Sequence, residues 1–592
     1  MAQIIPNDTD GADRYVGTLV GESTSREFRL AVAHETIREQ DIIAVDVELH
    51  QPEPQQIRVW AKVQRIERIN PLFPSEAGHE LAATHTNPFD TVLSLSREMV
   101  TAVCQVLGSE PLERRANGKL DHLRYPAQPA TSAYMPESTD IARVVLGDLA
   151  QKQQRSLDIA TLSNRPEVDV LVDGHAVVSR HLAILAMTGA GKSVTSRRII
   201  EELAGKNYPI VIFDPHGDYT GLVDVPALRN RVNRYYAQFP IFEQAPETVI
   251  SVVEALGWEL ANTHKSNFDE LFKGARTFIS GTPEDLATRT KWLSAYLQRE
   301  DIQKYGLKPD LYYFADFVQS VVQAGKDEDS DAQAKLVEWS GREQLKLKKQ
   351  IAGWLESLPN NLRMSARRLR EMAEISKRVA GTKEPLPTDR TKLVEYGKIS
   401  IVALAGYTGD FQAILYSLIA ESIFTARVDN TLKLPALLVL EEAHNFAPAQ
   451  AASSAEKRAI AATKQIAQEG RKFGVGLIMI SQRPSRLDET TLSQCNSFII
   501  MRMVNPADQN FVRKVIETLG EDDAKMLPDL DVGEALLSGQ FINFPVLVRV
   551  KQPGSKGERE EEDAFEALQK AYVSQKEQEK QQQAQSSKNW RR

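Results

Sequence analysis

The segment HLAILAMTGAGKSVTSRRIIEEL, residues 181–203, decides how the rest of this chain is interpreted. It begins with the apolar run HLAIL, passes through the glycine-rich octet AMTGAGKS (186–193), and continues into a helical stretch. A strand, a glycine-rich turn and a helix in this order form a phosphate-binding loop (P-loop), in which backbone N–H groups and the helix N-terminus hold phosphate oxygens. The segment therefore predicts a nucleotide-binding α/β fold.

The residues expected to bind nucleotide are Thr188, Gly189, Ala190, Gly191, Lys192, Ser193 and Val194. Lys192 can reach the β- and γ-phosphates and the Ser193 hydroxyl can bind Mg²⁺, so ATP and Mg²⁺ are the expected cofactors. The motif's first glycine is replaced by Ala186, which is tolerated if its φ stays negative. The alternative is a glycine-rich turn with a chance Lys-Ser, but that alternative leaves the flanking strand and helix unexplained.

Two acids, Glu441 and Glu442, follow the apolar run ALLVL at 436–440. Ligands of α/β folds bind at the carboxyl ends of the strands, so this pair is expected beside the P-loop. Glu441 is expected to support the water shell of Mg²⁺ and Glu442 to polarise the attacking water. The first acid of such a pair is usually Asp, and the longer Glu441 can still act through water. The alternative is a solvated helix N-terminus, where acids are favourable in any case.

Gln482 comes just after the apolar run GLIMIS, so its amide can sense the γ-phosphate or orient water. Arg471 precedes that run and can project across a subunit boundary, where a guanidinium stabilises charge on the transferring phosphoryl group. The alternative for Arg471 and Lys472 is an ordinary basic helix C-terminus. A further segment, FDPHGDY, lies on the same edge; its His216 either lines the site or is a turn residue satisfied by the backbone.

The remaining sequence divides into parts of different character. Short apolar strands dominate before residue 70, a helix is expected near 89–107, and buried-looking runs alternate with helical stretches from about 150, as in an α/β core. We expect an N-terminal β-barrel at 1–80, a partly helical connector at 81–150, an α/β core at 151–245 and 386–553, a helical insertion at 246–385, and a charged, Gln-rich tail at 554–592.

The composition excludes several classes of protein. At 592 residues the chain is too long for one hydrophobic core, and about three to five domains are expected. No apolar run is long enough to span a bilayer and the first residues do not form a secretory signal, so no membrane association is expected. Two distant cysteines, Cys104 and Cys495, make neither a disulfide framework nor a zinc site and favour the cytoplasm. A net charge of −8 argues against binding DNA over the whole surface, but leaves room for a local basic channel.

Together these motifs resemble the HerA family of the HerA/FtsK branch of P-loop ATPases. The resemblance is carried by RHLAILAMTGAGKS, FDPHGDY, LLVLEEAHNFAP, EGRKFGVGLIMISQRPS and VNPADQNFV, and it covers most of 155–245 and 395–550. It implies a RecA-like P-loop ATPase core under a small barrel, assembled as a homo-hexameric ring that binds ATP between subunits and pumps double-stranded DNA through its pore. It also implies that Glu442 is the catalytic acid, Gln482 the sensor and Arg471 the finger acting in trans.

The same resemblance suggests partners. Relatives work with a NurA-like nuclease in DNA end resection, and bacterial relatives occur with antiviral effectors such as sirtuin-like NADases or nucleases. Within the insertion, residues 342–383 hold eleven basic and four acidic residues, a net charge of +7. This stretch either contacts phosphates without reading sequence or is a solvated helix face.

Three functions remain open on the sequence alone. The first is a DNA-translocating ATPase ring, which the intact acid pair, Gln482 and Arg471 favour. The second is a nucleotide-binding ring that scaffolds and regulates an effector and hardly moves DNA. The third is a conjugation-type coupling ATPase, against which the missing membrane segment counts.

Overall fold

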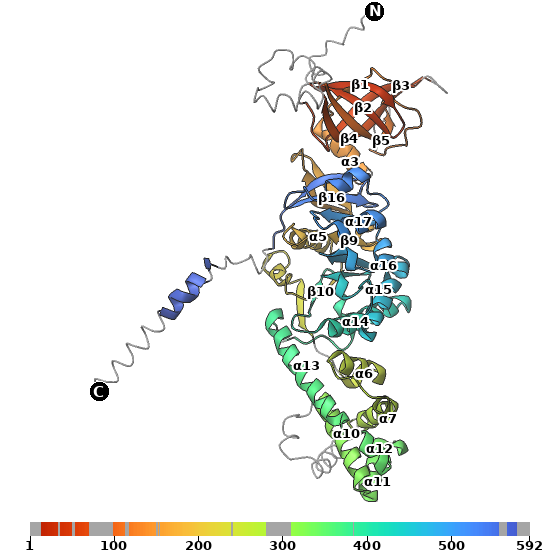
Figure 1. Ribbon diagram of the computed structural model, residues 1–592, viewed down its shortest axis with the longest axis vertical. Coiled ribbons are helices and arrows are strands. Elements are labelled where there is room, and N and C mark those ends of the chain that lie inside the picture. Colours follow the sequence, from red (N-terminus) through yellow and green to blue (C-terminus); the bar gives the residue numbers. More distant parts are fainter. Residues whose placement is uncertain are drawn as a thin grey trace, which may run out of the picture.

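The computed structural model of this chain is elongated, with a β-barrel at one end, a sheet-based core in the middle and a helical arm at the other end (Figure 1). The structure describes residues 14–33, 36–49, 54–69, 99–112, 118–147, 149, 152, 154–237, 241–279, 310–382, 384–555, 565, 566 and 568–576.

The barrel is closed, with strand order β1-β2-β5-β4-β3-β6. Its strands are β1 (Tyr15–Ser23), β2 (Glu27–Val32), β3 (Ile42–Leu49), β4 (Gln55–Ile69), β5 (Met99–Pro111) and β6 (Ser132–Tyr134). Exposed and buried residues alternate along β2, and its inward side chains Phe28 and Leu30 are buried in the barrel core. The alternation in the sequence thus gives the barrel its interior and exterior faces.

The barrel extends beyond the expected boundary at residue 80. Strands β5 and β6 come from the segment that was expected to be a connector, and β5 pairs with both β2 and β4. The prediction of a helix near 89–107 is wrong from Met99 onward, because that part of the chain forms strand β5. Residues 89–98 lie outside the described residues. The connector's helix is α3 (Ser138–Leu146), which follows the barrel.

The core is an eleven-stranded sheet of order β11-β12-β10-β13-β14-β9-β15-β16-β17-β7-β8. Neighbours from β11 to β15 are parallel, and those from β15 to β8 are antiparallel. The strands are β7 (Ser156–Leu162), β8 (Asp169–Asp173), β9 (Leu182–Leu185), β10 (Ile210–Asp214), β11 (Val232–Tyr236), β12 (Ile399–Ala403), β13 (Ala436–Leu440), β14 (Val475–Ser481), β15 (Ser497–Met501), β16 (Glu534–Gly539) and β17 (Val546–Val550). The predicted α/β P-loop core under a barrel is confirmed.

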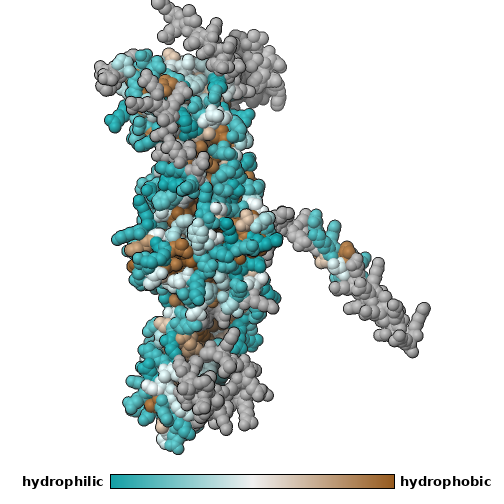
Figure 2. Space-filling view, turned by 180° about the vertical axis from the view of Figure 1, so that it is seen from behind, coloured by the Kyte–Doolittle hydropathy of each residue, from teal (hydrophilic) through white to brown (hydrophobic). Residues whose placement is uncertain are grey.

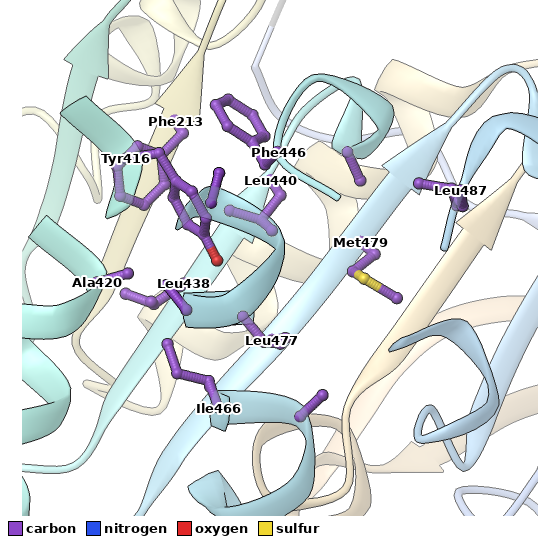
Figure 3. Close-up of a cluster of buried hydrophobic side chains, with 14 of the residues drawn as sticks. Phe213, Tyr416, Ala420, Leu438, Leu440, Phe446, Ile466, Leu477, Met479 and Leu487 are labelled. Carbon is purple, nitrogen blue, oxygen red and sulfur yellow. The ribbon is translucent and has the colours of Figure 1, made fainter. Parts of the chain in front are cut away.

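Helices cover both faces of this sheet, which explains why the parallel strands inside it are mostly apolar and buried, whereas the edge strand β11 is half-buried and contains Asn233 and Arg234. Leu438 and Leu440 of β13 pack with Phe213 and Tyr416 on the face beneath α14 (Gly409–Val428) and α15 (Ser454–Phe473) (Figure 3). The intervening Val439 belongs to a separate core on the face covered by α5 (Lys192–Gly205). The core helices are α4 (Gly174–Ser179), α5 (Lys192–Gly205), α14 (Gly409–Val428), α15 (Ser454–Phe473), α16 (Glu489–Ser493), α17 (Pro506–Val515) and α18 (Glu521–Lys525).

The arm lies between β11 and β12 and has its own hydrophobic core. Its helices are α6 (Pro246–Ala255), α7 (Asn262–Ile279), α10 (Leu311–Lys326), α11 (Ser330–Ser340), α12 (Lys349–Trp354) and α13 (Leu358–Ala380). Phe268, Phe272 and Phe314 form a ring cluster at its centre. The Ser376 hydroxyl of α13 donates to the carbonyl of Ala403 at 2.8 Å and so ties the root of the arm to β12.

The barrel is joined to the core through a buried ion pair. Lys62 of β4 places its Nζ 2.8 Å from Asp523 Oδ1 of α18, and each side chain is 2% exposed. A buried pair of this kind is costly to break, because either partner alone would be a desolvated charge. None of the helices in the described part of the chain is long and apolar enough to span a lipid bilayer.

Candidate active site

The P-loop joins the carboxyl end of β9 to the first turn of α5. Gly189 and Gly191 have φ of 80° and 108°, in the left-handed region where a residue with a Cβ is strained. A Cβ on Gly191 would also lie 3.0 Å from Met501 Cε. Ala186 is buried and keeps a negative φ, so its methyl group is accommodated, as the sequence required.

Neighbouring segments hold this loop in place. The Met187 N–H donates to the Arg502 carbonyl at 3.0 Å, and the Gly533 N–H donates to the Ala190 carbonyl at 3.0 Å. Of the residues expected to bind nucleotide, Thr188 and Gly189 are exposed, Gly191, Ser193 and Val194 are half-buried, and Ala190 and Lys192 are buried. The loop is therefore open towards its tip and anchored at its base.

The sheet order brings the expected catalytic side chains to the P-loop. Strands β13, β14 and β9 are adjacent and parallel, so the residues after their carboxyl ends meet at one edge. Lys192 Nζ lies 2.8 Å from Glu441 Oε1 and 2.6 Å from Glu442 Oε1. Gln482 donates from Nε2 to the same Glu442 oxygen at 2.6 Å, and Thr188 donates from its hydroxyl to Gln482 Oε1. The alternative of a solvated helix end does not apply, because both acids are buried.

Glu442 has an unusual backbone conformation for its residue type. Its φ of 51° and ψ of 57° place it in the left-handed region, where non-glycine residues pay a conformational cost. His444, two residues later, places Nδ1 3.3 Å from Glu442 Oε2. The carboxylate is thus contacted on both oxygens, by Lys192 and Gln482 on one and by His444 on the other.

The two acids have opposite electrostatic surroundings. Burial, only partly offset by Lys192, raises the pKa of Glu441 above its usual range. Burial also acts to raise the pKa of Glu442, but contacts from His444 and Lys192 outweigh it and lower that pKa. For Lys192, burial is outweighed by the charges of Glu441 and Glu442, and its pKa is raised. An ammonium and an ionised Glu442 therefore face each other at neutral pH.

The FDPHGDY segment contributes a residue that the sequence did not single out. Tyr219 is fully buried, and its hydroxyl lies 2.5 Å from Glu441 Oε2 and 2.9 Å from Ser196 Oγ. Burial and the nearby Glu441 raise the pKa of Tyr219 well above its usual value. The only signal in the sequence was its place shortly after the end of β10, at the same edge of the sheet.

His216 lies in the turn that follows β10, which agrees with one of the two possibilities left open by the sequence. The Asp214 carboxylate accepts backbone hydrogen bonds from His216 at 3.2 Å and Gly217 at 2.7 Å, and the His216 side chain is exposed. His444, like Tyr219, is a site residue that the sequence did not single out, although it stands two residues after the acid pair. Its proximity to Glu442 depends on the short turn that follows β13.

Arg471 lies away from the site within its own chain. It sits in the last turn of α15, which leads into the start of β14, whereas the P-loop lies where the parallel strands end. Its side chain is exposed and forms no ion pair with any described residue. The end of α15 and the whole of β14 lie between it and Gln482 in the sequence. The structure therefore does not bring Arg471 to the P-loop of its own chain.

The residues of the site fit ATP and Mg²⁺. The N-terminus of α5 and the left-handed glycines form the backbone cradle that phosphates require. Mg²⁺ prefers oxygen ligands, and the Ser193 hydroxyl and a Glu441 oxygen are the groups that would hold it or its waters. A bound Mg²⁺–ATP would supply the phosphoryl group to be transferred and a cation to neutralise its charge.

Comparison with known proteins agrees with this site. Residues 157–423 match the family described as the central domain of helicase HerA. A probable helicase of Methanocaldococcus jannaschii is 27% identical over 552 residues, which cover 91% of this chain and 95% of that protein. The DNA double-strand break repair helicase HerA of Pyrococcus furiosus is 27% identical over 531 residues, covering 83% of this chain and 85% of that protein.

Among solved structures, VirB4 of Thermoanaerobacter pseudethanolicus overlaps 67% of this chain and 96% of its own, with 15% identity and a TM-score of 0.42. The chain is thus similar to HerA helicases over most of its length, its residues 157–423 match the central domain of that family, and its P-loop site is that of an ATPase.

Proposed function

We propose that this protein hydrolyses ATP to translocate along double-stranded DNA, as a closed homo-hexameric ring that works with a partner nuclease or an antiviral effector. The observation that supports it most directly is the convergence of Lys192, Glu442 and Gln482, with both donors 2.6 Å from one carboxylate oxygen. This is the arrangement that couples a phosphate-binding cation to a water-orienting carboxylate and a sensing amide.

Each residue has a part in the proposed reaction. Lys192 stabilises negative charge on the β- and γ-phosphates, and Ser193 with Glu441 holds Mg²⁺. Glu442, kept ionised by its neighbours, orients and polarises the attacking water. Gln482 links that carboxylate to Thr188 at the exposed end of the P-loop. A movement of the Glu442 carboxylate would therefore be transmitted to Thr188 through two hydrogen bonds.

The proposed ring follows from the position of Arg471. If this guanidinium acts on a phosphoryl group, it must act on that of a neighbouring subunit, because its own P-loop lies at the opposite edge of the sheet. Such a contact is heterologous, and a heterologous contact closes into a ring or continues as a filament. A hexamer is the closed form that the HerA resemblance implies.

The helical arm gives limited support for DNA contact. Arg363 pairs with Asp316 at 2.8 Å, Arg370 pairs with Asp310, and Arg368 donates to the Leu256 carbonyl at 2.6 Å. These three guanidinium groups of α13 are therefore bound by other residues of the arm. Lys346 and Lys348 at the arm's far end, which is mostly hydrophilic in Figure 2, and Arg378 of α13 are exposed and form no ion pair with a described residue. The exposed Lys349 lies 3.8 Å from Glu328.

The contacts of Arg363, Arg368 and Arg370 within the arm leave fewer guanidinium groups for phosphates. This favours the second candidate function, a nucleotide-binding ring that scaffolds and regulates an effector. The two functions differ in what DNA does to the enzyme. For a translocase, linear duplex DNA should increase ATP turnover several-fold and ATP should drive displacement of a third strand bound to that duplex. For a scaffold, turnover should be the same with and without DNA and no strand should be displaced, which would overturn the proposal.

A further inference from the structure

Tyr219 is held in place by the turn that follows β10. The Asp214 carboxylate at the end of β10 accepts from the N–H groups of Gly217 at 2.7 Å and of Tyr219 at 3.2 Å. Gly217, with φ of 89°, permits the tight path, and a Cβ there would lie 2.9 Å from Val379 Cγ1. The backbone of Tyr219 is therefore held directly to the end of a central strand.

The hydroxyl of Tyr219 fixes the orientation of Glu441. One carboxylate oxygen of Glu441 faces Lys192 at 2.8 Å and the other faces Tyr219 at 2.5 Å. Glu441 stands where such acid pairs usually have Asp, and its extra methylene adds a rotatable torsion between the backbone and the carboxylate. A second contact on the far oxygen removes that freedom.

The same hydroxyl also reaches the other side of the expected magnesium site. Tyr219 lies 2.9 Å from Ser196 Oγ, and Ser196 Oγ lies 3.2 Å from the carbonyl oxygen of Ser193. One buried side chain thus connects Glu441 with the first turn of α5, from which the Ser193 hydroxyl projects. Partners that orient metal ligands in this way commonly change metal affinity by about 10–100-fold when they are removed.

We propose that Tyr219 is a positioning residue that holds the Glu441 carboxylate for Mg²⁺ at the nucleotide site. This inference rests on the proposed ATP-hydrolysing function and goes beyond it by assigning a role to the FDPHGDY segment. Tyr219 touches neither nucleotide nor water in this role; it acts through Glu441.

The test measures nucleotide binding rather than turnover. Full-length protein carrying Glu442→Gln is titrated with Mg²⁺ at a fixed concentration of a fluorescent ATP analogue, with and without Tyr219→Phe. We expect Tyr219→Phe to raise the Mg²⁺ concentration for half-maximal binding by about ten-fold, and to leave binding in EDTA unchanged.

Tyr416→Phe is the matched control. Tyr416 is also fully buried, its hydroxyl lies 2.9 Å from Thr463 Oγ1, and it packs in the core of Figure 3 on the opposite face of the sheet from α5. Both variants lose one buried hydroxyl, so both should lower the melting temperature, but only Tyr219→Phe should change the Mg²⁺ requirement. Equal Mg²⁺ curves for the two variants, or equal loss of binding with Mg²⁺ and with EDTA, would overturn the proposal.

A double-mutant cycle tests whether the effect passes through Glu441. In a Glu441→Ala background, Tyr219→Phe should cause no further change in the Mg²⁺ requirement; a further ten-fold rise would show that Tyr219 acts by another route and would overturn the inference. A parent protein that binds no nucleotide under any condition would instead overturn the proposed function, so the two failures are distinguishable.

Discussion

Lys192 and Glu442 are 250 positions apart in the sequence, yet the lysine Nζ lies 2.6 Å from the carboxylate Oε1. The pair forms because β9 and β13 flank β14 in the parallel sheet: Glu442 comes just after the end of β13, and Lys192 begins α5 after the P-loop that follows β9. Any substitution at one partner leaves the other as a buried charge with fewer contacts, so each variant must be checked for folding as well as for activity.

Lys192→Ala should abolish ATP turnover, with a loss of at least about 10²–10³-fold, because a preorganised cation against the phosphates is removed. Steady-state phosphate release measures this. Lys206→Ala, at the exposed far end of the same helix, is the control and should retain activity. Near-normal turnover in a correctly folded Lys192→Ala protein would rule out the P-loop assignment.

Glu442→Gln should bind ATP without hydrolysing it, because the amide keeps the shape of the side chain and loses its charge. Nucleotide retained after gel filtration, identified as ATP, is the expected observation. Glu441→Gln should instead increase the Mg²⁺ concentration needed for turnover. If both variants lost ATPase activity together with all ATP binding, this division of roles would be refuted.

Arg471→Ala and Lys192→Ala proteins should each be inactive alone and partly active when mixed. Some mixed interfaces would join an intact P-loop to an intact Arg471 from the neighbouring subunit, which restores a complete site. Subunit exchange must be demonstrated in the same sample, for example by native mass measurement. A monomer at micromolar concentration with ATP, or no recovery despite exchange, would contradict the ring.

Asp523→Ala should destabilise the junction between barrel and core by about 3–5 kcal/mol, because it leaves Lys62 buried and unpaired. Asp522→Ala in the same helix is the control; its pair with Lys525 is largely exposed and should be worth about 0–1 kcal/mol. The urea concentration at the midpoint of unfolding measures the loss of stability in both variants. The double variant Lys62→Met/Asp523→Leu should recover much of the loss, and a double variant as unstable as Asp523→Ala would contradict this explanation.

His181 should make the protein less stable as the pH falls. The residue is 2% exposed, and burial lowers the pKa of its imidazole to about 4. Its Nδ1 accepts a hydrogen bond from the Leu477 N–H at 3.0 Å, and its Nε2 lies 3.1 Å from the Ala467 carbonyl oxygen. The unfolded chain binds a proton near pH 6.5 and the folded protein does not, so stability is full above about 6.5 and is lost towards pH 4. Between pH 7 and pH 5 the loss should be about 2 kcal/mol.

The measurement is the unfolding free energy at several pH values, compared with His181→Gln. That variant is less stable at pH 7 but should lose less stability on acidification than the parent protein. His175→Gln, at an exposed position, should follow the parent. Parallel pH curves for the parent and His181→Gln would show that His181 is not the titrating group.

The sequence predicted the parts of the site that depend on local order. A strand, a glycine-rich turn and a helix are contiguous at the P-loop, and Glu441, Glu442 and Gln482 each directly follow an apolar strand. Adjacent parallel strands then bring those strand ends together. The contact between Tyr219 and Glu441 was not predictable, because it depends on β10 lying next to β13, which only the sheet order defines.

The barrel was predicted less well. In strands β1 to β4, apolar residues alternate with polar ones or follow one another between turn residues, so each strand can be recognised from its own sequence. The sequence of β5, MVTAVCQVLGSEP, contains Thr101 and three valines, β-branched residues that favour a strand, so the helix expected at 89–107 ran against local propensity from Met99 onward. The pairing of β5 with β2 and β4 makes the segment part of the barrel.

Because β7 pairs with β17, its sheet edge stays unpaired for a long time while the chain is being synthesised. Ala160 of β7 pairs with Val550 of β17, so the hairpin of β7 and β8 leaves the ribosome well before its partner strand exists. At about 5–20 residues per second, roughly 20–80 seconds pass before that edge can be paired. During this time the arm can form its own core, while the hairpin presents an unpaired strand edge that can associate wrongly with other chains. The last strand of the core therefore ends the period in which nascent chains need protection from aggregation.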